Sequence, residues 1–391
     1  MKPLQHLVIL DLSRVLACPF ASMILAELGA TVIKVEQPGA GDETRGFEPQ
    51  LSKDSAYFFA CNRSKASITV NLRHAQGQQV VRELAQKADV LVENFPAGTL
   101  ARYGLDFTML SALNPRLVYV SCTGFGQSGP YAHKKGYDTV FQAMGGLMSL
   151  TGEKGGGPVK PGLPVADLTS GLWVAVGILA MIAGRGRSGR GAHLDFSMLD
   201  GQVSLLTLAA ARYFALGEVP PRLGTEHPGR VPSATFRCKD GKFAHITASD
   251  QHWAPLCRAL NLKFDQELAS NESRIAHRED VMKKLTEAIL KIERAELLKL
   301  LDEADVPAGP VNDVAEILSD PHVRARGLVG SFDYPVVGEF KALAQPYKFL
   351  GWDDPAIGAP PALGADTERL LQEMLGYSRE KISQLKIDKA I

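Results

Sequence analysis

The chain has 391 residues, with 43 lysines and arginines against 43 aspartates and glutamates, so its formal net charge is zero. Apolar residues make up 45% of the sequence and charged residues 22%, which is the composition of an ordinary folded globular protein. The balanced charge argues against a nucleic-acid-binding protein, because such proteins need an excess of cations to neutralise phosphates. It does not exclude a pocket in which a few local cations hold one small anionic ligand.

The first half of the chain predicts a repeated unit of strand and helix. Residues 7–11 are an apolar strand, 19–28 a helix of small and apolar residues that ends at Gly29, and 31–35 a second apolar strand. Further strands are expected at 66–70, 90–92, 117–121 and 193–195, and further helices at 75–87, 109–113, 140–147, 172–183 and 199–214. This alternation predicts an α/β fold with a Rossmann-like parallel sheet covered on both faces.

The pattern changes after Gly217, where a linker rich in proline and glycine begins. Two short strands, at 234–237 and 243–248, flank a turn at 239–241, and helices are expected at 253–259, 279–292 and 294–304. This segment predicts a second, smaller α/β unit. Beyond residue 330 we expect a strand-like stretch, a proline-rich loop and a helix at 366–375.

The cysteines and the apolar stretches limit the class of protein further. The five cysteines form no Cys-x-x-Cys pair, so we expect neither a disulfide framework nor a metal site, and reduced thiols in a cytoplasmic protein. The first residues do not have the pattern of a secretory signal. Residues 171–184 form the most apolar stretch, shorter than the roughly 20 residues of a membrane span. We therefore expect a buried core helix there and no association with membranes.

A dinucleotide site is the first functional alternative, since Glu36 ends the second strand, where an acid can bond a ribose hydroxyl. The turn after the first strand, residues 13–19, contains no glycine. The Gly-x-Gly-x-x-Gly fingerprint needs glycines so that the backbone can approach the pyrophosphate. The sequence therefore argues against NAD binding.

Asp167 stands directly before the long apolar helix and has two interpretations. It is a simple N-cap, accepting from free backbone N–H groups, or a carboxylate fixed at a buried helix start that attacks an activated acyl group. The helix dipole is expected to keep it ionised. The two roles are compatible.

Two further groups can either hold phosphates and stack a base or be ordinary surface residues. Asn94 to Gly98 follow the strand at 90–92, and Arg102 comes one turn later. Lys134 and Lys135 stand close to Tyr137. A loop at the carboxyl end of a parallel strand is where open α/β sheets bind ligands.

Short segments in a fixed order along nearly the whole chain resemble the class III coenzyme A transferase family. This family includes formyl-CoA transferase, the carnitine CoA-transferase group and the α-methylacyl-CoA racemases. The segments are LDLSRVLA at 10–17, GATVIKVE at 29–36, GDETR at 41–45, NR at 62–63, NL at 71–72, VENF at 92–95, TGFGQSGP at 123–130, GYD at 136–138, AD at 166–167, VPAGPVN at 306–312 and GADT at 364–367. They most resemble the branch that moves CoA among C4–C6 dicarboxylic acids, such as the succinyl-CoA:glutarate type.

The resemblance implies that Asp167 is the catalytic nucleophile. It would form an aspartyl anhydride with the acyl group of a donor such as succinyl-CoA, and then an aspartyl-CoA thioester, before CoA passes to a small acid. CoA and acyl-CoA are then substrates, and no permanent cofactor or metal is implied. Residues carried over as CoA contacts are Val15, Val70, Leu72, Arg73, Asn94, Phe95, Arg102, Lys135 and Tyr137.

Tyr137 occupies the place where the racemase branch has a proton-transferring histidine, and tyrosine is a poor proton shuttle near pH 7. Transfer is therefore favoured over racemisation, with Tyr137 as a supporting residue. Arg45, His227 and Arg230 are candidates to bind the distal carboxylate of the acid. The sequence departs from the family at Cys18, at Gln37 and in the loop at 224–232, which has only two glycines.

The resemblance also implies an interlocked homodimer. We predict a large domain formed by residues 1–217 and a return segment at 321–391, with the linker and small domain at 218–320. An α-methylacyl-CoA epimerase and a non-catalytic CoA-binding module remain as alternatives.

Overall fold

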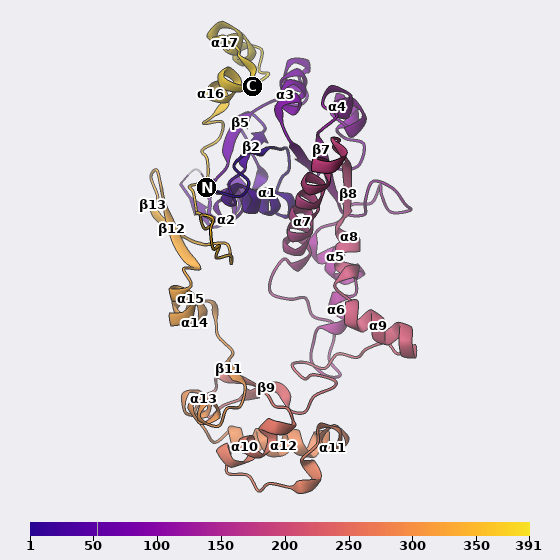
Figure 1. The fold of residues 1–391 in the computed structure, drawn as a ribbon, viewed down its shortest axis with the longest axis vertical. Helices are drawn as coiled ribbons and strands as arrows, with labels where there is room; N and C mark the ends of the chain where they lie inside the picture. Colours follow the sequence, from indigo (N-terminus) through magenta and orange to yellow (C-terminus); the bar gives the residue numbers. More distant parts are fainter. Residues whose placement is uncertain (53) are drawn as a thin grey trace. The chain divides into compact units, whose positions relative to one another are not determined.

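The computed structural model describes residues 1–52 and 54–391. Its main feature is a six-stranded sheet in the order β5-β2-β1-β6-β7-β8 (Figure 1). Every neighbouring pair in this sheet is parallel. The strands are β1 (Val8–Asp11), β2 (Thr31–Glu36), β5 (Ala66–Thr69), β6 (Val90–Glu93), β7 (Val118–Thr123) and β8 (His193–Ser197). The predicted mixed α/β fold with a parallel sheet is confirmed.

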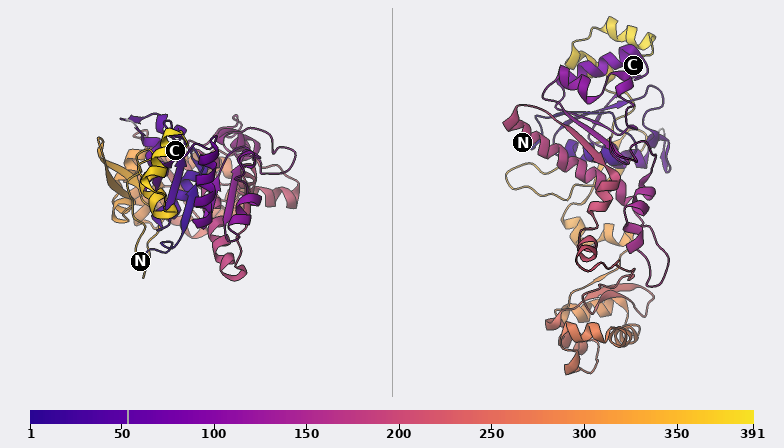
Figure 2. Two further views of the ribbon diagram at one scale, coloured as in Figure 1. Left: turned by 90° about the horizontal axis from the view of Figure 1, so that it is seen from above. Right: turned by 90° about the vertical axis from the view of Figure 1, so that its right-hand side faces the viewer.

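Helices cover both faces of the sheet, because successive strand residues point to opposite sides. Ile9 belongs to a core with α1 (Ala17–Glu27) and α7 (Val165–Ser188). Leu10 belongs to the core of the other face, with α3 (Ala75–Lys87) and α4 (Phe107–Leu113). In the right-hand view of Figure 2, the strands run between these two helical layers. Both faces are buried at the centre of the sheet, so strands β1, β6 and β7 are mostly apolar.

The end of the chain returns to this sheet. Helices α16 (Thr367–Leu375) and α17 (Arg379–Ile387) add to the core beside α3, as Figure 1 shows. The Asp366 carboxylate accepts a 3.0 Å hydrogen bond from the N–H of Ser67, at the edge strand β5. A hairpin of β12 (Val329–Tyr334) and β13 (Gly338–Leu343) packs its aromatic rings on α2 (Ala56–Asn62).

A second compact unit consists of Met148–Lys160 and Arg212–Pro321, and the first unit holds the remainder. Its antiparallel sheet has the order β11-β10-β9, and its helices pack on that sheet around Phe236, Trp253 and Leu285. The elements are β9 (Ser233–Arg237), β10 (Phe243–Thr247), α10 (Asp250–Ala259), α11 (Asn271–Ala276), α12 (Arg278–Ile289), α13 (Arg294–Glu303) and β11 (Ala308–Pro310). The domain boundaries at residues 217 and 320 stay a prediction.

The remaining α-helices of the described residues are α5 (Asp138–Met144), α6 (Leu147–Leu150), α8 (Met198–Ser204), α9 (Thr207–Leu216), α14 (Val314–Ser319) and α15 (Pro321–Ala325). The single helix expected at 199–214 is in fact two, α8 and α9.

The apolar helix α7 is longer and less buried than predicted. It has 24 residues and, by length and composition alone, could cross a membrane, with 33% of its most apolar window buried. Val174 and Ile178 lie in the core beneath the sheet, but Leu172, Trp173 and Val176 are exposed. The expected buried core helix is therefore buried on one side only in the single chain, where it meets the sheet and α1.

Candidate functional site

Asp167 is the third residue of α7, not the residue before the helix. The helix begins after Pro164, whose side chain provides no capping hydrogen bond. Instead the backbone N–H of Asp167 donates to the Asp138 carboxylate, with an N to Oδ1 distance of 3.1 Å. Gln142, one turn further along α5, donates to the other oxygen of Asp138 at 2.6 Å. Asp138 thus satisfies a free N–H of the first turn of α7, and the N-cap interpretation of Asp167 is wrong.

Burial and the nearby Asp138 carboxylate raise the pKa of Asp167 to about 7. The expectation that the helix dipole keeps this group ionised is therefore corrected, since desolvation and a like charge both disfavour the anion. At neutral pH the Asp167 side chain is present as acid and carboxylate in comparable amounts. A carboxylate that is partly withdrawn from water in this way is a stronger nucleophile than a solvated one.

Tyr57, the second residue of α2, belongs to the same electrostatic environment. Burial raises the pKa of its phenol to about 12, and the carboxylates of Asp167, Asp138 and Asp42 contribute to the shift. Sequence reasoning missed Tyr57, since no motif surrounds it. It selected Tyr137, which is 81% exposed and directly precedes α5.

The first turn of α1, directly after the loop that follows β1, lies against the start of α7. A Cβ atom added to Gly171, one turn after Asp167, would come within 2.6 Å of the Ala17 carbonyl oxygen. Val15 in this loop has φ of 68°, a left-handed conformation that strains a β-branched residue. Such strain persists only where surrounding contacts enforce it.

Two sets of contacts enforce it. The backbone of Arg14 and the side-chain amide of Asn94 exchange hydrogen bonds of 2.9 and 2.8 Å, which join this loop to the one after β6. The guanidinium of Arg14 lies 4.8 Å from the ring centroid of Phe95. The predicted CoA contacts Val15, Asn94 and Phe95 are therefore brought together at the carboxyl edge of the sheet.

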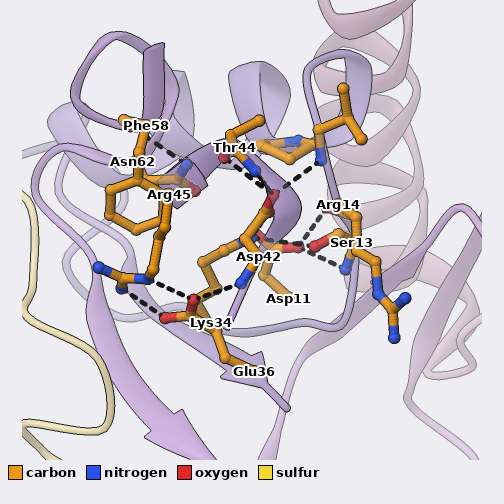
Figure 3. Close-up of polar contacts among 12 residues, drawn as sticks. Asp11, Ser13, Arg14, Lys34, Glu36, Asp42, Thr44, Arg45, Phe58 and Asn62 are labelled. Atoms are coloured by element: carbon orange, nitrogen blue, oxygen red, sulfur yellow. Dashed lines mark hydrogen bonds and ion pairs between the residues drawn. The ribbon is translucent and has the colours of Figure 1, made fainter. Parts of the chain in front are cut away.

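Buried charged side chains bond to the backbone of this loop (Figure 3). Lys34 is fully buried, lies 2.8 Å from an oxygen of Asp42 and donates to the Ser13 carbonyl at 3.0 Å. The N–H of Val15 donates to the other oxygen of Asp42 at 3.4 Å. Burial alone would raise the pKa of Asp42, but the charge and hydrogen bond of Lys34, together with the hydrogen bonds from Thr44, lower that pKa. The network thus holds the loop through ions that stay charged at neutral pH.

Arg45 is part of the same network and is not available to a substrate. It donates to both oxygens of Glu36, at 2.8 and 2.7 Å, and to Asp54 at 2.5 Å. Its guanidinium also lies 3.7 Å from the ring centroid of Phe58. These contacts explain why the arginine is buried. We therefore withdraw Arg45 as a candidate for binding the acid.

The other predicted CoA residues lie in the same unit. Val70 is buried directly after β5 and Leu72 packs on the core beneath α3, so both lie in the loop that leaves the carboxyl end of β5. Arg73, Arg102 and Lys135 are exposed, and none forms an ion pair within residues 1–52 and 54–391; Arg102 is 3.5 Å from the Thr99 hydroxyl. Three cations thus remain available to an anion.

His227 and Arg230 are exposed residues of the second unit, so their role in binding the acid stays a prediction. The His227 Nδ1 accepts a 3.0 Å hydrogen bond from the Gly229 N–H. Among the described residues, no group of three or more histidine, cysteine, aspartate and glutamate side chains could hold a metal ion.

Known proteins match the chain along nearly its whole length. The sequence pattern of CoA-transferase family III matches residues 4–367. The succinyl-CoA:glutarate CoA-transferase of Mus musculus is 38% identical over 389 residues, which cover 98% of this chain and 89% of the mouse protein. The succinyl-CoA:mesaconate CoA-transferase of Haloarcula marismortui is 37% identical over 385 residues, covering 95% of this chain and 96% of that protein.

A solved structure agrees with this match. The crystal structure of a CAIB/BAIF family protein from Brucella suis superposes with a TM-score of 0.87 at 38% identity, covering 95% of this chain and 99% of that chain. Sequence and fold together show that the chain belongs to CoA-transferase family III.

Proposed function

We propose that this enzyme moves CoA from an acyl-CoA donor, succinyl-CoA or a similar thioester, to a C4–C6 dicarboxylic acid. The observation that carries the proposal is Asp167, a partly buried carboxyl group with a pKa of about 7 on the first turn of α7. The substrate class is supported by the names of the relatives, which act on succinyl-CoA with glutarate or mesaconate.

The proposed reaction uses Asp167 as a reversible covalent carrier. Its carboxylate attacks the thioester carbonyl, forming an aspartyl-acyl anhydride and releasing CoA thiolate. The thiolate attacks the aspartyl carbonyl, giving an aspartyl-CoA thioester and the free donor acid. The acceptor carboxylate then attacks this thioester, re-forming an anhydride and the thiolate. Attack of the thiolate on the acceptor's acyl carbonyl yields the new acyl-CoA and restores the Asp167 carboxylate.

The surroundings of Asp167 suit these steps. Donor and product are both thioesters, so the exchange needs no ATP. Asp138 holds the backbone of Asp167 in place through the 3.1 Å hydrogen bond. The raised pKa of Tyr57 keeps its phenol protonated, and a protonated phenol can donate a hydrogen bond to an oxyanion.

We propose that CoA lies along the carboxyl edge of the sheet. Val15, Asn94 and Phe95 meet there, and the loop that carries both Val70 and Leu72 leaves the same edge. Arg73, Arg102 and Lys135 would face its phosphates, since exposed cations without an acidic partner suit a phosphate. Tyr137 supports the bound thioester. His227 and Arg230 remain the candidates for the distal carboxylate.

We also propose that two copies of the chain form a homodimer. Leu172, Trp173 and Val176 expose apolar surface along α7, and an exposed patch of this kind is typical of an interface. Light scattering of the purified chain should give twice the mass of 42.2 kDa. A single-chain mass at micromolar concentration would contradict the dimer.

The function is tested by incubating the protein with succinyl-CoA and glutarate, itaconate, mesaconate, oxalate or carnitine, without ATP. A new dicarboxylyl-CoA in the chromatogram is the expected result, and its absence across the panel would exclude the dicarboxylate proposal. An epimerase would instead exchange deuterium into the α-carbon of a 2-methylacyl-CoA without acyl exchange. A CoA-binding module would bind CoA with no turnover.

A further inference from the structure

Glu93 is a buried carboxyl group that the proposed transfer does not use. It is the last residue of β6 and is 5% exposed. The buried carboxylates of Asp11, Glu36 and Asp42 each lie beside a lysine or an arginine. Among the described residues, no cation forms an ion pair with Glu93. A buried acid costs free energy unless polar groups bond it, so its hydrogen-bond partners indicate its role.

One oxygen of Glu93 bonds the loop that follows β6. The backbone N–H of Phe95 donates to the Glu93 Oε2 at 2.8 Å. The next residue, Pro96, has no N–H and favours an extended conformation for Phe95. The guanidinium of Arg14 lies 4.8 Å from the centroid of the Phe95 ring. Glu93 therefore fixes the backbone of Phe95, while Arg14 contacts its ring.

Side chains of the two neighbouring strands fix the orientation of the Glu93 carboxyl group. Ser121 of β7 is directly beside Glu93 in the sheet, and its hydroxyl donates to the carboxylate. The Ser121 Oγ also lies 3.0 Å from the His193 Nε2 of β8. The ring of His193 stacks on Phe107, with centroids 5.2 Å apart. A carboxyl group held in this network has little freedom to rotate away from the Phe95 N–H.

The contact with Phe95 does not require a charged carboxylate. Burial raises the pKa of Glu93 to about 7, and the carboxylate of Asp195 adds to the rise, while the hydrogen bonds from Ser121 and from the Phe95 N–H oppose it. Both the acid and the carboxylate keep an oxygen that accepts the Phe95 N–H. A neutral side chain with an oxygen in the same place should therefore replace Glu93.

We infer that Glu93 is a positioning residue for CoA, which acts through the Phe95 N–H to hold the loop at 94–98 in the conformation that binds CoA. This inference rests on the proposed function, in which Phe95 contacts CoA. Asn94 holds the same loop at a second point, through its two hydrogen bonds with the backbone of Arg14. Because Glu93 acts through the loop and not on the reacting atoms, its loss should weaken CoA binding and leave the chemical step nearly unchanged.

The test is calorimetry of CoA binding to the full chain, together with the kinetics of transfer from succinyl-CoA. Glu93→Leu removes the acceptor and leaves the Phe95 N–H without a partner. The Kd for CoA and the KM for succinyl-CoA should rise about tenfold, while kcat stays within about twofold. Glu93→Gln keeps an oxygen for the N–H and should stay within about twofold of the wild type in all three constants.

Hydrogen exchange reports on the contact without any ligand. The amide of Phe95, followed by mass spectrometry of its peptide, should exchange faster in Glu93→Leu than in the wild type or in Glu93→Gln. Ile382→Ala is the control for lost stability, because Ile382 belongs to the core on the same side of the sheet but lies on α17. It should lower the melting temperature and leave the Kd for CoA unchanged.

Ser121→Ala tests the same contact where Glu93→Leu does not fold. It keeps the carboxyl group but removes the hydroxyl that orients it, so the Kd for CoA should rise about threefold. An unchanged Kd in Glu93→Leu, or in Ser121→Ala where Glu93→Leu does not fold, would overturn the inference. Equal losses in Glu93→Leu and Glu93→Gln, or a fall in kcat with an unchanged KM, would also overturn it.

The binding measurement keeps this inference separate from the proposed function, because it uses CoA alone, without an acceptor acid. A wild type that binds CoA but transfers it to none of the acids in the panel would reject the dicarboxylate proposal. The comparison of Glu93→Leu with Glu93→Gln would then still decide whether Glu93 positions the loop for CoA.

Discussion

The backbone N–H of Asp167 donates a 3.1 Å hydrogen bond to the side chain of Asp138, a residue from a different helix. One carboxylate thus has two effects on another. It satisfies a free donor at the start of α7, which fixes the position of Asp167, and its charge adds to burial in raising the pKa of the Asp167 side chain.

Replacing Asp138 with asparagine should separate these two effects. The amide oxygen of Asp138→Asn can still accept the Asp167 N–H, but the negative charge is gone. The pKa of Asp167 should fall, because desolvation then acts without the like charge. The acidic limb of the pH profile of kcat/KM, expected near pH 7 in the wild type, should move down by about one pH unit.

The matched control is Asp200→Asn, which removes an exposed carboxylate on α8. It should leave the acidic limb of the pH profile unchanged. An unchanged limb in Asp138→Asn would show that Asp138 does not influence the titration of Asp167.

The Asp167 side chain should also destabilise the folded chain at neutral pH. Its pKa is 3.8 as a model value and about 7 in the folded chain, so the folded state binds the proton more tightly. The free energy of unfolding should therefore decrease as pH rises from about 4 to about 7. Asp167→Asn removes this dependence. Urea unfolding should find the variant more stable than the wild type by about 2 kcal/mol at pH 8 and equal to it at pH 4. Equal stability at both pH values would contradict the raised pKa.

Lys34→Met should destabilise the chain strongly. The substitution leaves the buried carboxylates of Asp42 and Asp11 without one of their cations, and such a loss typically costs about 3–5 kcal/mol. Lys386→Met removes the exposed partner of Glu368 and should cost less than about 1 kcal/mol. The free energies of unfolding of Lys34→Met and Lys386→Met, each measured in urea, are compared with that of the wild type. A similar, small effect of both variants would mean that the network does not support the loop.

Arg45→Lys distinguishes a structural residue from a ligand for the acid. Lysine cannot reproduce the paired contacts with Glu36 or the stacking on Phe58, so the melting temperature should fall. The KM for the acceptor acid should stay within about twofold of the wild type, because four of the five N–H groups of the Arg45 guanidinium already bond protein oxygens. An unchanged melting temperature with a KM raised tenfold would restore Arg45 as a ligand.

The local pattern of the sequence predicts the sheet and its helices well. Helix α3 was expected at residues 75–87 and is found there, because its apolar side chains repeat with a helical period and Ala88 ends it. The start of α7 was placed seven residues too late, at 172 in place of 165. Asp167, Thr169 and Ser170 interrupt the apolar pattern at the start of the helix, and its capping group, Asp138, comes from elsewhere in the chain.

Contacts between residues far apart in the chain also explain which site residues the sequence did not reveal. Val15, Asn94 and Phe95 meet because they follow adjacent parallel strands, which topology makes foreseeable. Tyr57 reaches the neighbourhood of Asp167 only through tertiary packing of α2, and Arg45 loses its role to Glu36 and Asp54 in the same way. Such pairings depend on contacts that no local pattern encodes.

The central claim, that Asp167 carries the acyl group and CoA covalently, is tested most directly by mass spectrometry of its peptide. The protein should be incubated with succinyl-CoA, quenched in acid and digested, with and without hydroxylamine. We predict that the peptide containing Asp167 gains the mass of CoA minus water, and that hydroxylamine converts this adduct to the hydroxamate. An enzyme that forms the new acyl-CoA while this peptide stays unmodified, or that turns over equally as Asp167→Asn, would contradict the account.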